Sequence, residues 1–474
     1  MDTVIDQAMR PVADTVSGFI FFTVPIFGAD LPLIVLWLIG GGVFFTVYLR
    51  FVNIRGFKHA IDIVRGKYEN PDDPGEISQF QALTTAVSGT VGIGNIAGVA
   101  VAISVGGPGA TLWLIIAGLL GMSTKLAECT LGVMFRKVND DGSISGGPMY
   151  YLERGLAALG WPRLGRGLGI FYAASMVVGC LGIGNMFQSN QAAVIFIDVT
   201  GGADSFFADK AWLVGVALAI GVAAVIIGGI RSIATTTAKL VPGMALLYVL
   251  TALLIIGLNY ENLPTAIAAI WHGAFSPSGV AGGMLGGMII GFRRAVFSNE
   301  AGLGSAAIAH STARTTEPVS EGFVSLLEPF IDTVVICTIT ALVITTTVYE
   351  PGMVENGVSG IELTTRAFAS TLSWSPLPLS IAAILFAFST MIAWSYYGLK
   401  AFTYLFGDNR VTDIGFKLFF LTFVVLGSSV QLSALVDLSD ALVFVVAIPN
   451  LLGLYVLAPL IRKNVIDYEK RIRR

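Results

Sequence analysis

Long apolar runs recur along the whole chain, separated by short polar stretches. A helix that crosses a bilayer needs about 20 mostly apolar residues. The pattern therefore predicts an all-α integral membrane protein with 11 transmembrane helices, at 31–52, 80–104, 109–136, 167–197, 211–229, 236–258, 281–310, 322–347, 376–405, 413–433 and 440–461. An earlier apolar run, 19–27, is too short to span, and we expect it to lie on the membrane surface or to plug a vestibule.

Composition supports the membrane class and excludes several others. Only 12% of the 474 residues are charged, whereas a soluble domain carries about 25%. No basic run with interleaved aromatics occurs, so we expect no nucleic-acid partner. Cys129, Cys180 and Cys337 lie in apolar stretches without a metal-binding pattern, and no nucleophile elbow or phosphate loop is present. We therefore expect neither an enzyme nor a cofactor.

The distribution of lysine and arginine predicts the orientation in the cell membrane. With the N-terminus outside, 22 of the 28 basic residues fall in cytoplasmic loops, their flanks and the tail. Arg10, Lys210 and Arg366 fall on the opposite side. Because cytoplasmic segments carry an excess of Lys and Arg, the expected topology is N-terminus outside and C-terminus cytoplasmic, with the bilayer as a partner.

One eight-residue pattern occurs twice inside apolar runs. SGTVGIGN at 88–95 and SNEAGLGS at 298–305 share the form Ser-x-x-aliphatic-Gly-aliphatic-Gly-polar. Each copy begins a group of five predicted spans, and five is odd, so the copies cross the membrane in opposite directions. This predicts a 5+5 inverted repeat, with the chain divided into an N-terminal segment and first helix (1–79), two repeats (80–258 and 281–461), an extracellular connector (259–280) and a basic tail (462–474).

Paired glycines predict that both helices are interrupted at these copies. Backbone groups freed inside a membrane must find partners; exposed N–H groups suit a carboxylate, and exposed carbonyls suit Na⁺. The alternative is close helix packing by small residues. In the first copy we expect Na⁺ ligands at Ser88, Val91 and Asn95, and substrate contacts at Gly89, Thr90, Gly92 and Gly94.

The second copy lies among intramembrane charges. A charge at mid-membrane costs about 2.5–3.5 kcal/mol on insertion scales, so it is normally paired or faces a cavity. An intact helix would align Arg293 with Glu300, which suggests a structural ion pair; alternatively, Glu300 lies near a substrate amine or a gate. We expect gating or ion-pair roles for Arg293, Arg294, Glu300 and Asp332, and substrate contacts at Phe297, Ser298, Asn299 and Gly302.

Two other spans carry candidate polar residues. Ser389 and Thr390 either bond carbonyls of their own helix or bind Na⁺ against the first break. Thr390 and Trp394 are four residues apart and share a helix face, so they suit a lid over a small side chain. Gln188 lies in a polar cluster that serves as pocket lining or as glue between helices.

These segments together resemble the alanine or glycine:cation symporter family over nearly the whole chain. The matching motifs are GTVGIGNIAG (89–98), GGPG (106–109), FSNEAG (297–302) with GSA (304–306), and STMIAW (389–394). The resemblance implies the leucine-transporter fold with one added N-terminal helix and two discontinuous helices. It also implies Na⁺-driven import of alanine or glycine, with Thr390 and Trp394 lining the side-chain pocket. Ala295 and Glu317 depart from the family pattern, away from that pocket.

Three rival functions remain open at this stage. The first is a proton-coupled symporter of the same fold, with Glu300 or Asp332 carrying the proton. The second is a membrane-embedded enzyme, for which no catalytic dyad can be assembled from the sequence. The third is a channel, which two asymmetric breaks disfavour. The sequence does not separate alanine from glycine or serine as substrate.

Overall fold

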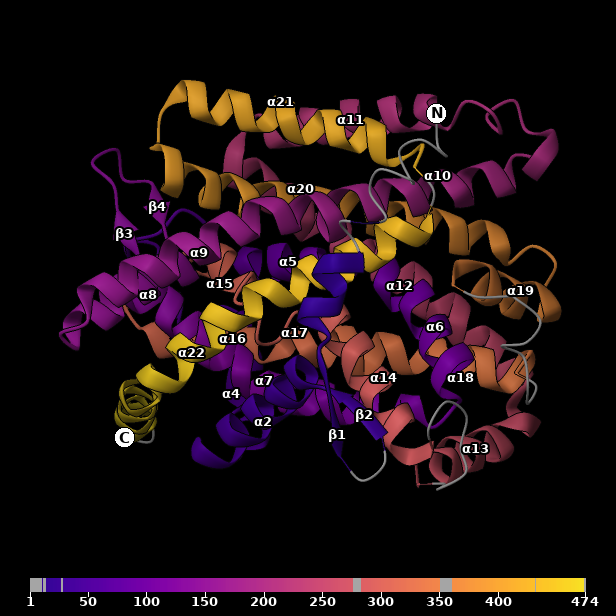
Figure 1. Cartoon of the computed structure of the whole chain (residues 1–474), viewed down its shortest axis with the longest axis horizontal. Helices are drawn as coiled ribbons and strands as arrows, with labels where there is room; N and C mark the ends of the chain where they lie inside the picture. The colour runs from indigo at the N-terminus through magenta and orange to yellow at the C-terminus, as the bar shows by residue number, and fades with distance from the viewer. Residues whose placement is uncertain are drawn as a thin grey trace.

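The computed structural model describes residues 11, 14–26, 29–275, 283–349, 360–430 and 432–472. Parts of four predicted segments lie outside the described residues: 1–10, 12–13 and 27–28 of the N-terminal segment, 276–280 of the connector, 281–282, 350–359 and 431 of the second repeat, and 473–474 of the tail. The described chain is a bundle of helices at many inclinations, with two small hairpins at its periphery (Figure 1).

Each predicted apolar run coincides with helix. In chain order the helices are α2 (Leu33–Tyr48), α5 (Gln79–Thr90) with α6 (Ala97–Gly106), α7 (Ala110–Met134), α9 (Pro162–Leu181) with α10 (Phe187–Val199), α11 (Ala211–Ile226), α12 (Gly229–Leu258), α14 (Gly283–Asn299) with α15 (Ala306–His310), α16 (Pro318–Ser325) with α17 (Leu327–Pro329) and α18 (Thr338–Thr347), α20 (Pro376–Phe406), α21 (Arg410–Gly427) and α22 (Leu432–Ile472). Among the described residues, six helical stretches are long and apolar enough to span a membrane, and the bent α5–α6 pair adds a seventh. The multi-pass prediction is confirmed, while the count of eleven stays a prediction.

Shorter elements that the apolar pattern did not predict connect the long helices. They are the helices α3 (Val52–Arg55), α4 (Phe57–Val64), α8 (Pro148–Ala158), α13 (Leu263–Phe275) and α19 (Ile361–Thr371), and the antiparallel hairpins β1 (Thr23–Ile26)–β2 (Ala29–Pro32) and β3 (Lys137–Val138)–β4 (Ile144–Ser145). Two π-helical stretches, Gly182–Met186 and Phe330–Cys337, interrupt otherwise regular helices. Such stretches occur frequently at functional sites.

The first predicted break is present between α5 and α6. A capping box starts α5, in which Ser78 Oγ accepts from Gln81 N and Gln81 Oε1 accepts from Ser78 N. The helix ends at Thr90, Val91 and Gly92 are extended, and a short 3-10 turn over Ile93–Asn95 leads into α6. The axes of the two halves differ by 61°, so the discontinuity expected near 89–95 is confirmed.

The second break lies between α14 and α15. Three residues after Asn299 have left-handed backbone: Glu300 (φ 57°), Gly302 (φ 93°) and Gly304 (φ 76°). Glycine tolerates this conformation, whereas for glutamate it is uncommon. Because the helix ends before Glu300, the alignment of Arg293 with Glu300 that an intact helix would give does not occur. The Arg293 guanidinium lies instead over the ring of Phe21, at 4.1 Å.

The N-terminal segment packs on the bundle. The Phe21 ring lies 5.3 Å from the ring of Phe444 on α22, and the guanidinium of Arg293 on α14 lies over the same Phe21 ring. Strand β2 contacts α14 as well. The segment therefore packs on the helices, and the two expectations for it, the membrane surface and a vestibule plug, stay predictions.

A single arginine ties the two broken helices together at one end of the bundle. Arg136, just after α7, donates to the carbonyls of Ser311 (2.8 Å), Ala313 (2.7 Å), Pro74 (2.7 Å) and Thr315 (2.8 Å). Pro74 precedes α5, while the other three carbonyls follow α15. Together with backbone hydrogen bonds between 74–77 and 312–315, this arginine joins the segment before α5 to the segment after α15.

Candidate functional site

Trp394 of α20 joins the two breaks. Its Nε1 donates to the carbonyl of Gly89 at 3.2 Å and to Glu300 Oε1 at 3.0 Å. The side chain is 1% exposed. Its ring lies so close to Gly184, in the first π-helical stretch, that a Cβ there would come within 2.2 Å of it. Gly184 is therefore part of the site, although nothing in the sequence distinguishes it among 55 glycines.

Oxygen atoms of the predicted Na⁺ ligands gather where α5 meets α20. Thr390 Oγ1 donates to the carbonyl of Ser88 at 3.0 Å, and Ser88 Oγ donates to the carbonyl of Ser389 at 3.0 Å. The Ser389 hydroxyl instead bonds its own helix, at the carbonyl of Phe386. Ser389 therefore bonds its own helix, whereas Thr390 bonds a carbonyl at the first break. Na⁺ binding by these residues and by the buried Val91 stays a prediction.

Two backbone N–H groups of the first break donate hydrogen bonds to side-chain amide oxygens. Gly92 N donates to Asn95 Oδ1 at 2.9 Å, and Ile93 N donates to Gln188 Oε1 at 3.3 Å. Gly92 itself lies between Thr390 and Gln188, since a Cβ there would be 2.7 Å from Thr390 Oγ1 and 3.3 Å from Gln188 Oε1. Both N–H groups are therefore satisfied by amide oxygens of the protein itself.

The end of α14 forms the opposite wall. A Cβ on Gly94 would lie 3.4 Å from the ring of Phe297 and 4.0 Å from the Cα of Ser298. The Phe297 ring also meets Phe187 edge-on at 5.7 Å, and Arg294 lies 5.1 Å from its centroid. The structure thus brings Gly89, Gly92, Gly94, Gln188, Phe297, Ser298, Thr390 and Trp394 together around the two breaks.

Three predicted substrate residues contact other parts of the protein. The Thr90 hydroxyl bonds carbonyls of its own helix. Asn299 donates to Thr333 Oγ1 at 2.9 Å and caps Ala301 N, and Gly302 packs against Leu38 of α2. Their substrate role stays a prediction that these contacts do not favour.

Asp332 lies at the centre of a second oxygen-rich cluster. Its carboxylate accepts from Ser298 Oγ at 2.8 Å, Asn95 Nδ2 at 2.5 Å and Thr333 Oγ1 at 2.6 Å. The side chain is fully buried, and Lys125, the cation whose field reaches it, is already paired with Glu328. A buried carboxylate with only neutral donors calls for a cation or a proton. Asp332 and Glu328 are four residues apart on one predicted span. This spacing does not indicate the partners that Asp332 has on other helices, so the sequence did not predict this cluster.

A chain of alternating charges runs beneath the second break. Lys125 Nζ lies 3.1 Å from Glu328 Oε2, Glu328 Oε1 lies 2.5 Å from His310 Nε2, and His310 Nδ1 lies 2.5 Å from Glu321 Oε1. Gln79 Nε2 donates to the other oxygen of Glu321. A neutral imidazole has only one N–H donor, so two carboxylate neighbours require one further proton, on the ring or on a carboxyl. The chain Lys–Glu–His–Glu is then neutral overall.

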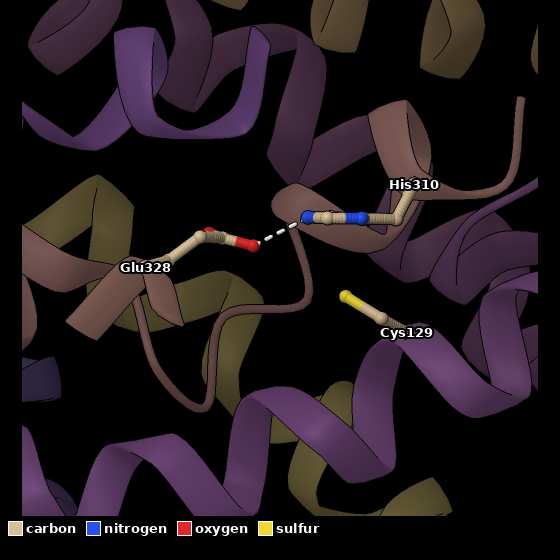
Figure 2. A group of neighbouring side chains, drawn as sticks. All are labelled: Cys129, His310 and Glu328. Carbon is tan, nitrogen blue, oxygen red and sulfur yellow. Dashed lines mark hydrogen bonds and ion pairs between the residues drawn. The ribbon is translucent and has the colours of Figure 1, made fainter. Parts of the chain in front are cut away.

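Figure 2 shows His310 and Glu328 facing each other, with the Cys129 sulfur beside them. Their ligand atoms lie within 4.8 Å of one another, as in a metal site. The His310–Glu328 separation of 2.5 Å argues against that interpretation. Metal–ligand bonds of about 2.0–2.2 Å at a tetrahedral angle would hold these two atoms more than ~3 Å apart. In this structure His310 and Glu328 therefore share a hydrogen bond, at a spacing shorter than two ligands of one metal ion would keep.

Asn450 of α22 stabilises the second break from the other side. Its Nδ2 donates to the carbonyl of Gly302 and to Glu128 Oε1, both at 2.7 Å, and Gly304 N also donates to Glu128 Oε1. The Glu300 carboxylate accepts from Ser305 in the same turn. These contacts satisfy backbone groups that the interrupted helix leaves open.

Comparison with known families settles the class of this protein. Residues 19–474 match the sodium:alanine symporter family. The chain belongs to this family. Among its relatives, the sodium/alanine symporter AgcS of Methanococcus maripaludis is 40% identical over 433 residues, covering 90% of this chain and 92% of its own. The probable sodium/glutamine symporter GlnT of Bacillus subtilis is 32% identical over 441 residues, covering 93% and 88%.

This member of the sodium:alanine symporter family has the fold that the family resemblance implied. MhsT in complex with L-phenylalanine superposes with a TM-score of 0.57 at 14% identity, covering 83% of this chain and 98% of its own. The chain is thus a cation-coupled amino-acid symporter of the leucine-transporter fold, embedded in the membrane by several passes, and not an enzyme.

Proposed function

We propose that this symporter imports alanine or glycine together with Na⁺ by alternating access. The observation that carries the proposal is that α20 contacts both breaks. Thr390 bonds Ser88, and Trp394 bonds Gly89 and Glu300. Backbone groups of two interrupted helices facing one another are the usual substrate site of such transporters. The name of the relative AgcS supports both alanine and sodium.

In this proposal the substrate lies between the two breaks. Its carboxylate takes the N–H groups of Gly92 and Ile93, now bonded to Asn95 and Gln188. Its side chain lies towards Phe297 and Trp394, where we expect no substituent larger than a methyl group to be accepted. The inverted repeat (80–258 and 281–461), with the N-terminus outside and the C-terminus cytoplasmic, provides the rocking motion.

Two oxygen clusters are candidate Na⁺ sites. One combines the carbonyl and hydroxyl of Ser88 with Ser389 and Thr390, and the other surrounds Asp332 with Asn95 and Ser298. Hard cations prefer oxygen ligands. The second cluster also supplies the negative charge that compensates a cation inside the membrane.

The direct test is uptake of radiolabelled alanine into proteoliposomes. An inward Na⁺ gradient should drive accumulation, whereas an equal K⁺ gradient should not. Accumulation driven by an inward proton gradient without Na⁺ would contradict the proposal and support the proton-coupled alternative, which the buried carboxyls of Glu300 and Asp332 keep open.

Replacing Asp332 with asparagine should raise the half-saturating Na⁺ concentration by at least about tenfold, because one charge-assisted ligand is lost. The variant keeps the size of the side chain and its contacts with Ser298 and Thr333. Asp62→Asn, in an ion pair outside the site, is the control and should match the wild type. An unchanged Na⁺ dependence together with loss of a pH response would assign Asp332 to a proton instead.

Alanine amide should compete poorly with alanine. If N–H groups at the first break recognise the carboxylate, removal of its charge costs about 1.5–3 kcal/mol, which is about 10- to 150-fold in the inhibition constant. Glycine, which keeps the carboxylate, is the control competitor. Equal inhibition by alanine and alanine amide would mean that the carboxylate is not recognised there.

A further inference from the structure

A pocket of about 200 Å³ opens between the end of α2 and the last turns of α22. It is remote from both helix breaks. Tyr48, Leu49, Val465 and Ile466 supply an apolar part, and charged side chains supply the rest. Its position at the polar end of two apolar helices places it where lipid headgroups meet the bundle.

Positively charged side chains predominate in this pocket. Arg50, Arg55, Arg462 and Lys470 line it, against the single carboxylate of Glu469. Glu469 pairs with Arg55 at 3.1 Å, and Lys470 Nζ lies 3.8 Å from a carboxylate oxygen of Asp467. The two remaining arginines face no further carboxylate among the residues that line the pocket. This excess of positive charge is the electrostatic pattern of an anion site.

Contacts within the protein hold two of the arginine side chains of this pocket in place. Two hydrogen bonds hold Arg55 in place. Its Nε donates to the carbonyl of Arg50 at 2.7 Å, and its Nη2 donates to the carbonyl of Leu49. The guanidinium of Arg462 lies 4.7 Å from the centroid of the Tyr48 ring, which itself stacks on Phe44 at 5.0 Å. These contacts fix the directions from which two of the arginines approach the pocket.

Apolar side chains continue from the pocket along the outer face of α2 and α3. Val47 is 58% exposed, Phe51 51% and Ile54 71%. The chain turns there through Arg50 and Phe51, both in the left-handed region (φ 58° and 56°), a conformation that non-glycine residues rarely adopt. The turn places a basic and an aromatic side chain at the same corner, and a ligand matching it has an anionic phosphate and an apolar body.

We propose that this pocket binds the headgroup phosphate of an anionic phospholipid, whose acyl chains lie along Val47, Phe51 and Ile54. Basic pockets between membrane helices on the cytoplasmic side bind such headgroups, and the basic residues here lie on the side predicted to be cytoplasmic. The lipid links α2, outside the two repeats, to α22, the last helix of the second. The proposal is independent of the transported substrate.

The test compares two lipids and one soluble anion on the purified full chain in detergent. Phosphatidylglycerol, at about 100 times its dissociation constant, should raise the melting temperature by several degrees, whereas phosphatidylcholine and inorganic phosphate should not. An equal shift with inorganic phosphate would assign the pocket to a free anion. An equal shift with phosphatidylcholine would mean that only the apolar surface binds, and either result overturns the proposal.

Matched variants locate the effect. Arg50→Gln/Arg462→Gln should lose most of the phosphatidylglycerol shift, and Lys463→Gln, the exposed neighbour outside the pocket lining, should keep it. Equal shifts in the two variants would place the lipid elsewhere. Native mass spectrometry of the wild type in equimolar phosphatidylglycerol and phosphatidylcholine gives a check that needs no variant, because equal retention of both lipids would also contradict the proposal.

Discussion

Replacing Lys125 with methionine is expected to destabilise the protein by about 3–5 kcal/mol, the usual cost of removing one partner from a buried ion pair. Lys125 and Glu328 are both fully buried, 3.1 Å apart. The variant would leave Glu328 facing His310 alone, so the chain of alternating charges would carry an uncompensated negative charge inside the membrane. The melting temperature of the purified protein measures the effect, with the exposed Lys58→Met as the control.

The double variant Lys125→Met/Glu328→Gln should be more stable than the Lys125→Met variant alone. It removes one positive and one negative charge together, which leaves His310 paired with Glu321. The coupling between the two substitutions should be at least about 1 kcal/mol, as for residues in one network. Additive losses would mean that the two side chains do not depend on each other, and that the charge-balance interpretation is wrong.

Trp394→Phe is expected to lower the rate of alanine uptake at low substrate concentration by about 5- to 150-fold. Phenylalanine preserves most of the ring but removes the Nε1 donor shared by Gly89 and Glu300. An unsatisfied buried acceptor costs about 1–3 kcal/mol. Trp271→Phe, at a 58% exposed position, is the control. Unchanged uptake in Trp394→Phe would show that the indole N–H does not position the breaks.

Trp394→Ala tests the size of the pocket separately. Leucine should inhibit alanine uptake weakly in the wild type and more strongly in this variant, because the indole no longer excludes larger side chains. Each methylene contributes about 1–3 kcal/mol to discrimination in an apolar pocket, so the ratio of leucine to alanine inhibition should change by at least about tenfold. An unchanged ratio would assign Trp394 to helix packing, and the substrate range would then be set elsewhere.

The sequence predicted the backbone features of the site well. Two glycines close together weaken a helix wherever they occur, so the breaks at 88–95 and 298–305 followed from the repeated pattern alone. Helical spacing also put Thr390 and Trp394 on the face that meets the first break. Local chemistry and periodicity were sufficient for these features because each depends on residues close together in the chain.

The partners of buried charges were harder to predict. Glu328 and Asp332 are four residues apart, but Glu328 bonds Lys125 and His310 while Asp332 bonds Asn95 and Ser298. The π-helical stretch that begins at Phe330 interrupts the regular helical spacing between the two residues, so their side chains meet different neighbours. Such pairings depend on which helices lie side by side, and helical spacing within one span carries no information about that.

Opening at the end where Arg136 gathers four carbonyls would have to break those hydrogen bonds together with the backbone hydrogen bonds between 74–77 and 312–315. The guanidinium bonds segments that flank both broken helices, and together with these backbone bonds it forms a latch. Arginine does not deprotonate in proteins, so its part of the latch is indifferent to acidity. The rate of inward opening is then expected to depend on this whole set of contacts, in which the Asp73 carboxylate also accepts from Thr316 N.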